Sequence, residues 1–203
     1  MTLDWERWYR EGVTYRQLDE PVLDDLLSTI TDKRGDKIRT ALDVGCGAGE
    51  LAGQLSRRGI ATTGIDGSTA AIVRAQANTA HITLEHRPTF LVADINDLAN
   101  NPTVTRYDTI WNKLVIAFIE ERQRFFRSLG AHMNEYGWCV TISPVLTDDN
   151  RELVTPKLKA ISVDRKSLLT DLHQVFATTI TWRLADMRDH GSLGIFVSGE
   201  RRT

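Results

Sequence analysis

The chain has 203 residues, of which 41% are hydrophobic and 26% are charged, and its formal net charge at pH 7 is −2. This length predicts one domain, and the composition is that of a globular chain that buries a core. The near-neutral charge does not favour a general binder of nucleic-acid backbones. With no signal-peptide core, no apolar run approaching about 18 residues and no cysteine framework, we expect a cytoplasmic protein without a membrane span.

The N-terminal part predicts two helices before the first strand. Residues 3–11 carry Trp5 and Trp8 among charges in a short amphipathic pattern. Apolar residues then recur at helical spacing from Leu18 to Ile30. We expect the two tryptophans to pack on the body of the domain.

The stretch LDVGCGAGE, residues 42–50, joins a strand, a turn and a helix. The apolar run Arg39–Val44 predicts a buried strand, and residues 51–58 predict the helix that leaves the turn. Three alternate glycines make the turn, Gly45, Gly47 and Gly49. Glycine has no Cβ and tolerates positive φ, so backbone N–H groups there can approach a ligand closely. We therefore expect a ligand at this turn.

The glycine spacing and the residue after it restrict the class of ligand. Dinucleotide-binding turns read G-x-G-x-x-G, whereas this turn reads G-x-G-x-G. Glu50 follows where the helix begins, and its carboxylate would repel a pyrophosphate at the helix N-terminus. The turn therefore disfavours a nicotinamide dehydrogenase and favours a ligand without phosphate groups. S-adenosylmethionine is such a ligand, since it offers a sulfonium, an ammonium and ribose hydroxyls.

Two more apolar segments resemble the first strand in ending at an aspartate. Ile60–Asp66 predicts a second strand and Phe90–Asp94 a third, with a helix capped by Ser68 and a loop over Ala80–Pro88 between them. The three carboxyl ends carry Asp43, Asp66 and Asp94. Because ligands of doubly wound sheets bind outside the carboxyl ends of the strands, we expect these carboxylates at the ligand site.

The alternation of strands and helices continues to the end of the chain. Tyr107–Trp111 predicts a fourth strand, a loop then opens with Asn112 and Lys113, and a helix follows near Glu120–Tyr136, ended by Gly137. Trp138–Ile142 predicts the fifth strand. This order argues for a parallel sheet with right-handed crossovers.

The C-terminal segment predicts a different pairing. A capped helix over Asp164–Val175 precedes two strands, Phe176–Leu184 and Leu193–Ser198. Only about eight residues separate these strands, too few for a crossover helix, so they must pair antiparallel.

The motif LDVGCGAGE and the aspartates that end the strands resemble the class I S-adenosylmethionine-dependent methyltransferases. The resemblance implies an α/β, Rossmann-like, doubly wound and mostly parallel seven-stranded sheet with a C-terminal antiparallel hairpin, whose seventh strand lies between the fifth and sixth. It also implies one methyltransferase domain, with an N-terminal extension or lid (1–38), a cofactor-binding core (39–145) and a C-terminal part (146–203).

The resemblance implies a set of cofactor-binding residues, namely Asp43, Gly45, Cys46, Gly47, Gly49, Asp66, Gly67, Ser68, Asp94, Ile95 and Asn112. In the family the glycines surround the methionine part of S-adenosylmethionine, the acidic residue after the second strand holds the ribose hydroxyls, and that after the third accepts from the adenine amine. Two of these residues also have structural explanations. The alternative for Asp43 is a structural cap on the turn without ligand contact, and the alternative for Cys46 is a small residue that simply fits the turn.

The same resemblance implies a small-molecule acceptor methylated on an O, N or S atom, with S-adenosylhomocysteine as the product. Tyr9, Tyr15 and Lys113 are the expected substrate residues. His190, on the loop of the C-terminal hairpin, is the candidate catalytic base, although a solvated loop histidine is the alternative. No metal site is expected.

Other functions stay open. A methyltransferase that acts on RNA or protein would need a basic or aromatic docking face, and Arg122, Arg124 and Arg127 share one predicted helix, where a solvated face is the alternative. A non-catalytic domain that binds S-adenosylmethionine is the other possibility. We expect no nucleic-acid partner, no membrane partner, and a monomer or homodimer.

Overall fold

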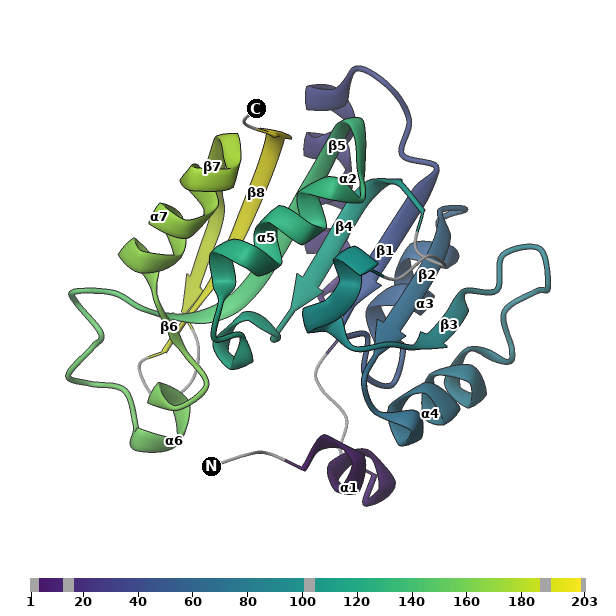
Figure 1. Cartoon of the computed structure of the whole chain (residues 1–203), viewed down its shortest axis with the longest axis horizontal. Coiled ribbons are helices and arrows are strands. Elements are labelled where there is room, and N and C mark those ends of the chain that lie inside the picture. Colours follow the sequence, from purple (N-terminus) through teal and green to yellow (C-terminus); the bar gives the residue numbers. More distant parts are fainter. Residues whose placement is uncertain (1–3, 13–16, 101–104, 187–190, 202–203) are drawn as a thin grey trace.

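The computed structural model describes residues 4–12, 17–100, 105–186 and 191–201. Within these residues, eight strands form one sheet in the order β3-β2-β1-β4-β5-β8-β7, with β6 paired to β5 (Figure 1). The strands are β1 (Thr40–Val44), β2 (Ala61–Asp66), β3 (Thr89–Val92), β4 (Tyr107–Lys113), β5 (Met133–Leu146), β6 (Val163–Asp164), β7 (Phe176–Asp186) and β8 (Ser192–Arg201).

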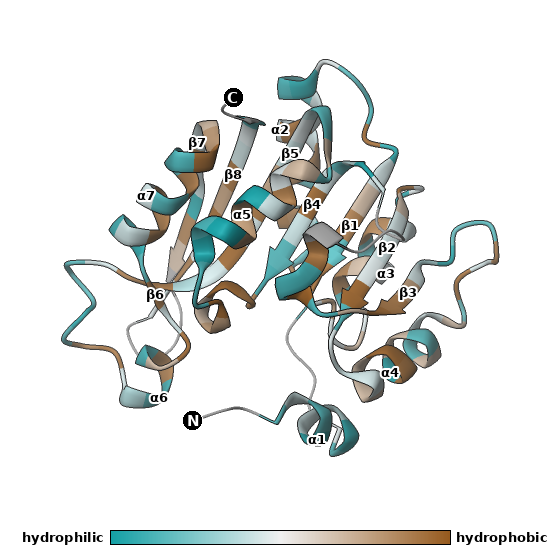
Figure 2. Cartoon of the chain, in the orientation of Figure 1, coloured by the Kyte–Doolittle hydropathy of each residue, from teal (hydrophilic) through white to brown (hydrophobic). Residues whose placement is uncertain are grey.

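Helices cover both faces of the sheet. The α-helices are α1 (Trp5–Arg10), α2 (Glu20–Arg34), α3 (Glu50–Ser56), α4 (Thr69–Thr79), α5 (Arg122–Ala131), α6 (Pro156–Lys159) and α7 (Arg165–Val175), with 3₁₀ turns η1 (Ile95–Asn100) and η2 (Ile116–Phe118). Apolar residues of α2 and α3 pack in one cluster and those of α5 and α7 in another, on opposite sides of the strands. Figure 2 shows mixed polar and apolar residues on α5 and α7, as expected for helices with one buried side. The doubly wound fold is therefore confirmed.

Strand directions follow the family pattern. β1 to β5 pair parallel in the order β3-β2-β1-β4-β5, and β8 lies antiparallel between β5 and β7. The described sheet has eight strands rather than the seven expected, because residues 163 and 164 pair with the end of β5. Two residues are too few to give a strand pattern in the sequence.

The boundary between α5 and β5 differs from the prediction. α5 ends at Ala131 and β5 already begins at Met133, whereas the sequence pattern placed a helix as far as Tyr136. Met133 pairs with Tyr107, and the ladder then shifts register before the pair Thr109 and Trp138. Gly137 lies in this irregularity, where a Cβ would be only 3.0 Å from the carbonyl oxygen of Asn134. Gly137 therefore permits a tight bend in a strand and does not cap a helix.

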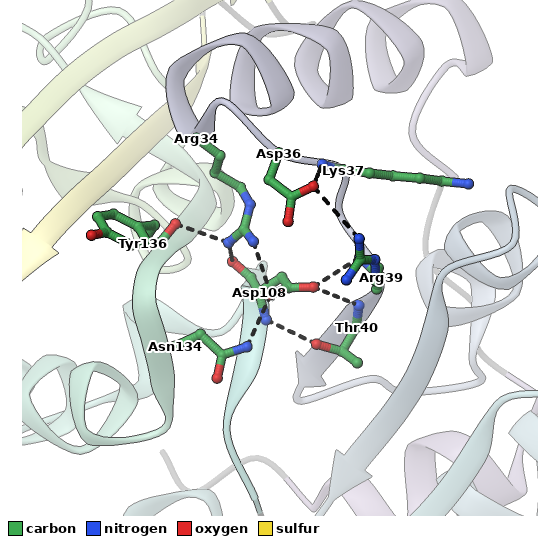
Figure 3. Close-up of polar contacts among 8 residues, drawn as sticks. All are labelled: Arg34, Asp36, Lys37, Arg39, Thr40, Asp108, Asn134 and Tyr136. Carbon is green, nitrogen blue, oxygen red and sulfur yellow. Dashed lines mark hydrogen bonds and ion pairs between the residues drawn. The ribbon is translucent and has the colours of Figure 1, made fainter.

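A buried ion pair joins four elements at the amino ends of the strands. Figure 3 shows Arg34, at the end of α2, against Asp108, near the start of β4; Arg34 Nη2 donates to Asp108 Oδ1 at 2.9 Å. The backbone N–H groups of Arg39 and Thr40 donate to Asp108 Oδ2 at 2.8 and 3.1 Å, and Asn134 donates to Oδ1 at 2.9 Å. This network fixes the edge of the sheet opposite the carboxyl ends.

Candidate active site

A cavity of about 460 Å³ opens at the carboxyl ends of the parallel strands. Its lining comes from the glycine turn after β1, the residues after β2 and β3, the end of β4, and α1. A cavity of this size is in the range of small-molecule sites, about 300–1,000 Å³. It lies where β1 is flanked by β2 and β4, which is the switch in strand order at which doubly wound folds bind ligands.

The glycine turn is held to the end of β2. The N–H groups of Gly45 and Cys46 both donate to the carbonyl of Ile65, at 2.8 and 2.9 Å. Gly45 and Gly47 have φ values of 69° and 53°, in the left-handed region that favours glycine. A Cβ on Gly47 would be 2.5 Å from the hydroxyl oxygen of Tyr9, so the turn also requires glycine in order to pack against α1.

Asp66 is fixed in this cavity by the backbone. Its Oδ2 accepts from the N–H of Gly47 at 3.0 Å, and its Oδ1 accepts from the N–H of Ser68 at 2.9 Å. Burial raises the pKa of Asp66, and these two backbone donors oppose the rise. Because each carboxylate oxygen can accept a second hydrogen bond, the fixed carboxylate can also bind hydroxyl groups of a ligand.

Three charged side chains meet at the floor of the cavity. Asp43 is only 2% exposed, and among the described residues its Oδ2 has no hydrogen-bond partner. Burial raises the pKa of Asp43 to about 7, against the opposing effect of Lys113. Burial also raises the pKa of Glu50 and lowers that of Lys113. An unpartnered carboxylate oxygen at this depth suits a cationic ligand group.

Helix α1 lies beyond the carboxyl ends of the strands (Figure 1), and its residues Trp5, Glu6 and Tyr9 line the cavity. Oε2 of Glu6 accepts from Ser68 Oγ at 2.8 Å and from the N–H of Ala70 at 3.1 Å, at the start of α4. The rings of Trp5 and Phe118 meet edge to face with centroids 4.9 Å apart. Trp5 therefore packs on the body of the protein, as the sequence predicted, and lines the cavity as well.

Most of the expected site residues come together here. The cavity is lined by the expected residues Tyr9, Asp43, Gly45, Cys46, Gly47, Asp66, Gly67, Ser68, Asp94, Ile95 and Lys113. Gly49 lies behind the turn, where a Cβ would be 2.9 Å from both Ala75 and Phe90. Its role in this structure is close packing of α3 against α4 and β3.

Asn112 is not among the residues that line the cavity. It is a residue of β4 rather than of the following loop, and its buried side-chain amide donates to the Val140 carbonyl at 3.3 Å and to Thr141 Oγ1 at 3.0 Å. The amide therefore links β4 to β5. Tyr15 and His190 lie outside the described residues.

Sequence reasoning missed Glu6, Leu114 and Phe118, which also line the cavity. Leu114 has φ 62°, and its N–H donates to the Ile142 carbonyl at 2.7 Å, so the chain turns sharply after β4. No residue type there signalled a left-handed conformation, which is uncommon outside glycine and asparagine. The amphipathic pattern of residues 3–11 was a signal for Glu6, but not for its place against α4.

The alternative sites have little support in the described parts of the chain. On helix α5, two of the three arginines have an acidic partner, Arg122 with Asp171 at 2.7 Å and Arg124 with Glu121 at 3.2 Å. No group of three His, Cys, Asp or Glu side chains is placed to hold a metal ion in the residues described. Nor is any described helix both long and apolar enough to cross a membrane.

The fold and the cavity define a Rossmann-like protein with a cavity at its glycine turn. A family model described as a methyltransferase domain matches residues 36–186, which is most of the chain. The chain therefore belongs to this methyltransferase family, and the family expected from the sequence is confirmed. No match is found among curated proteins.

Solved structures share the fold at low sequence identity. The magnesium protoporphyrin IX methyltransferase ChlM from Synechocystis PCC 6803, with bound S-adenosylmethionine, has a TM-score of 0.67 and 17% identity over 97% of this chain and 91% of its own. The plantazolicin methyltransferase BamL, in complex with a triazolic desmethylPZN analogue and S-adenosylhomocysteine, has a TM-score of 0.69 and 14% identity over 89% of this chain and 84% of its own. The cyclase SpnF has a TM-score of 0.67 and 16% identity over 92% and 86%.

Proposed function

We propose that this protein is an S-adenosylmethionine-dependent methyltransferase that methylates an O, N or S atom of a small molecule and releases S-adenosylhomocysteine. The observation that carries the proposal is the convergence of the glycine turn, Asp66 and Asp94 on one cavity. Solved structures of this fold that contain S-adenosylmethionine or S-adenosylhomocysteine support the cofactor assignment. The expected single domain, with its core at residues 39–145, is part of the proposal.

The residues present fit this cofactor. The unpartnered Oδ2 of Asp43 suits the methionine ammonium, and the fixed carboxylate of Asp66 suits the ribose hydroxyls. A Cβ on Gly67 would meet only the Ala93 carbonyl oxygen within 4 Å, at 3.9 Å, which supports space for a ligand against this backbone. We assign Asp94 to the adenine amine and Ile95 to the adenine ring.

The cofactor, when bound, would supply a methyl group on a sulfonium: an acceptor atom would bond to the methyl carbon in line as the bond from that carbon to sulfur breaks, and S-adenosylhomocysteine would be the leaving group. The chain's own contribution is to bind and orient the two molecules and to exclude water. Holding reacting atoms about 3–3.5 Å apart in alignment can contribute up to about 7–11 kcal/mol. We assign the exclusion of water to helix α1, because its residues cover the cavity.

The acceptor side of the cavity is apolar. Trp5, Val115, Phe118 and Ile119 line it next to the turn after β4. Such an apolar wall supports a small acceptor with an aromatic or aliphatic part. ChlM and BamL are likewise named as methyltransferases of magnesium protoporphyrin IX and plantazolicin, neither of which is an RNA. Tyr9 is buried against the glycine turn, and it stays our candidate for contact with the acceptor. From the sequence alone, Tyr15 is a second candidate for this contact and His190 is the candidate catalytic base.

The binding test compares two aspartate variants. A hydrogen bond to an ionised group contributes about 1.5–3 kcal/mol, so Asp66→Ala should weaken S-adenosylhomocysteine binding by at least about tenfold in calorimetry. Asp25→Ala removes an exposed carboxylate on α2 and serves as the control. Equal affinity of both variants and the wild type would remove Asp66 from the site.

The activity test must detect methyl transfer itself, because the neighbour SpnF is a cyclase on the same fold. Wild-type protein is incubated with S-adenosylmethionine carrying a labelled methyl group and, in separate reactions, with small phenols, amines, thiols and carboxylic acids, with RNA, and with protein. We expect a labelled acceptor product together with S-adenosylhomocysteine. Cofactor binding with label only on RNA or protein would replace the small-molecule acceptor by a macromolecule.

We also propose a cytoplasmic location and a monomer or homodimer. The two cysteines, Cys46 and Cys139, are free and buried, which supports a reducing compartment.

A further inference from the structure

Lys113 shares one face of the sheet with Asp43. In the parallel pair of β1 and β4, Asp43 is level with Trp111, and Lys113 follows Trp111 by two residues. Side chains two residues apart in a strand point to the same face, and so do paired residues on neighbouring strands. Asp43 and Lys113 are therefore diagonal neighbours on adjacent strands, and both line the cavity.

Lys113 is the one cationic side chain among the described residues that line the cavity. Asp43 from β1 and Glu50 from the first position of α3 both act on it electrostatically, and it is half-buried. Two acidic groups and one ammonium make this floor electrostatically uneven, with the acidic groups at the glycine turn and the positive charge at the end of β4. Such an arrangement is complementary to a zwitterion.

The methionine part of the cofactor is a zwitterion, with an ammonium and a carboxylate on the same carbon atom. Its ammonium suits Asp43 and Glu50, but its carboxylate would be repelled by those same groups unless a cation lies beside them. On this basis, which rests on the proposed function, we infer that Lys113 binds the carboxylate of the cofactor's methionine part.

This inference moves Lys113 from the acceptor side, where the sequence placed it, to the cofactor. The change has a structural reason: Leu114 turns the chain directly after Lys113, so the apolar acceptor wall begins only at the next residues. Lys113 lies before that turn, at the end of β4, and belongs to the charged floor of the cavity.

The test compares S-adenosylhomocysteine with S-adenosyl-3-thiopropylamine, which lacks only the carboxylate. In calorimetry, the wild type should bind the decarboxylated ligand at least about tenfold more weakly, as expected for the loss of a charge-assisted hydrogen bond. Lys113→Met should lose affinity for S-adenosylhomocysteine while keeping that for the decarboxylated ligand, so that the difference between the ligands disappears. Lys37→Met, at an exposed lysine before β1, should discriminate like the wild type.

Three outcomes overturn the inference. Equal binding of both ligands by the wild type shows that the carboxylate has no charged partner, and unchanged discrimination by Lys113→Met assigns the partner elsewhere. If Lys113→Met does not fold, as judged by circular dichroism, Lys113→Gln takes its place, and unchanged discrimination by that variant overturns the inference equally. Failure of the wild type to bind S-adenosylhomocysteine at all contradicts the proposed function instead, so the two failures are distinguishable.

Discussion

At the scale of single residues, Asp43 is a group whose charge is strongly affected by the fold. It is buried at the carboxyl end of β1, faces Lys113 from β4, and feels the negative charges of Glu50 on α3 and Asp66 on β2. Burial dominates and raises its pKa from 3.8 to about 7. The cofactor-free protein therefore holds this carboxyl partly protonated at neutral pH.

This raised pKa predicts a pH-dependent effect of Asp43→Asn on stability. Because the folded protein binds the proton more tightly than the unfolded chain, the contribution of Asp43 to stability is full below about pH 4 and is lost as the pH rises towards 7. The asparagine variant has no such loss, so its free energy of unfolding relative to the wild type should increase through this range, by up to about 1.4 kcal/mol per pH unit. Urea denaturation of the cofactor-free proteins at several pH values measures it, and a difference that does not vary with pH would argue against a titrating Asp43.

At the scale of elements, α1 is attached to the body by few contacts. Besides Glu6 against Ser68 and Ala70, Arg74 of α4 donates to the Tyr9 carbonyl at 2.9 Å, and Trp5 packs edge to face on Phe118. A short helix at the surface, held by a few polar contacts and by the buried Tyr9, opens more readily than the core. This suits an element that must admit the cofactor and then cover it.

Glu6→Ala should loosen α1 without unfolding the protein. We expect faster amide hydrogen exchange over residues 5–10. We also expect weaker binding of S-adenosylhomocysteine, because α1 would spend less time docked over the cavity. Glu11→Ala is the matched control, since Glu11 pairs only with Arg7 of the same helix in the contacts described, at 2.7 Å. If both variants exchange and bind alike, Glu6 does not hold α1 in position.

At the scale of the whole molecule, the two ends of the parallel strands have different roles. The carboxyl ends carry the cavity, and the amino ends carry the Arg34–Asp108 network (Figure 3). The side chains of this ion pair are only 6% and 10% exposed. Fixing the amino ends holds β1 and β4 in register; the glycine turn follows β1, and Lys113 is the last residue of β4.

Asp108→Ala should therefore destabilise the protein strongly while leaving its site intact. Removing one partner of a buried ion pair typically costs about 3–5 kcal/mol, because the other charge stays buried. Chemical denaturation should show this loss, whereas Asp36→Ala, at an exposed aspartate beside Arg39, should cost little. The folded Asp108→Ala protein should bind S-adenosylhomocysteine nearly as the wild type does; a large loss of affinity would show that the network shapes the site directly.

The sequence predicted the parts of the site that local patterns determine. The glycine turn and the aspartates Asp43, Asp66 and Asp94 were predicted because each follows an apolar strand, and parallel strands bring their carboxyl ends to one edge. The position of the Asn112 side chain was not predicted. The sequence pattern ended the fourth strand at Trp111, whereas Asn112 is still part of β4, and its place in the strand decides which face of the sheet its side chain lies on. The packing of Glu6 on α4 was missed because it joins segments 62 residues apart.

The most direct test of the cofactor assignment is a calorimetric titration of the wild-type protein with S-adenosylhomocysteine and, in parallel, with NAD. The acidic floor and the fixed Asp66 predict saturable binding of S-adenosylhomocysteine at one site per chain and no binding of NAD, whose pyrophosphate Glu50 would repel. Binding of NAD alone, or of neither ligand, would contradict the assignment of the glycine turn to S-adenosylmethionine.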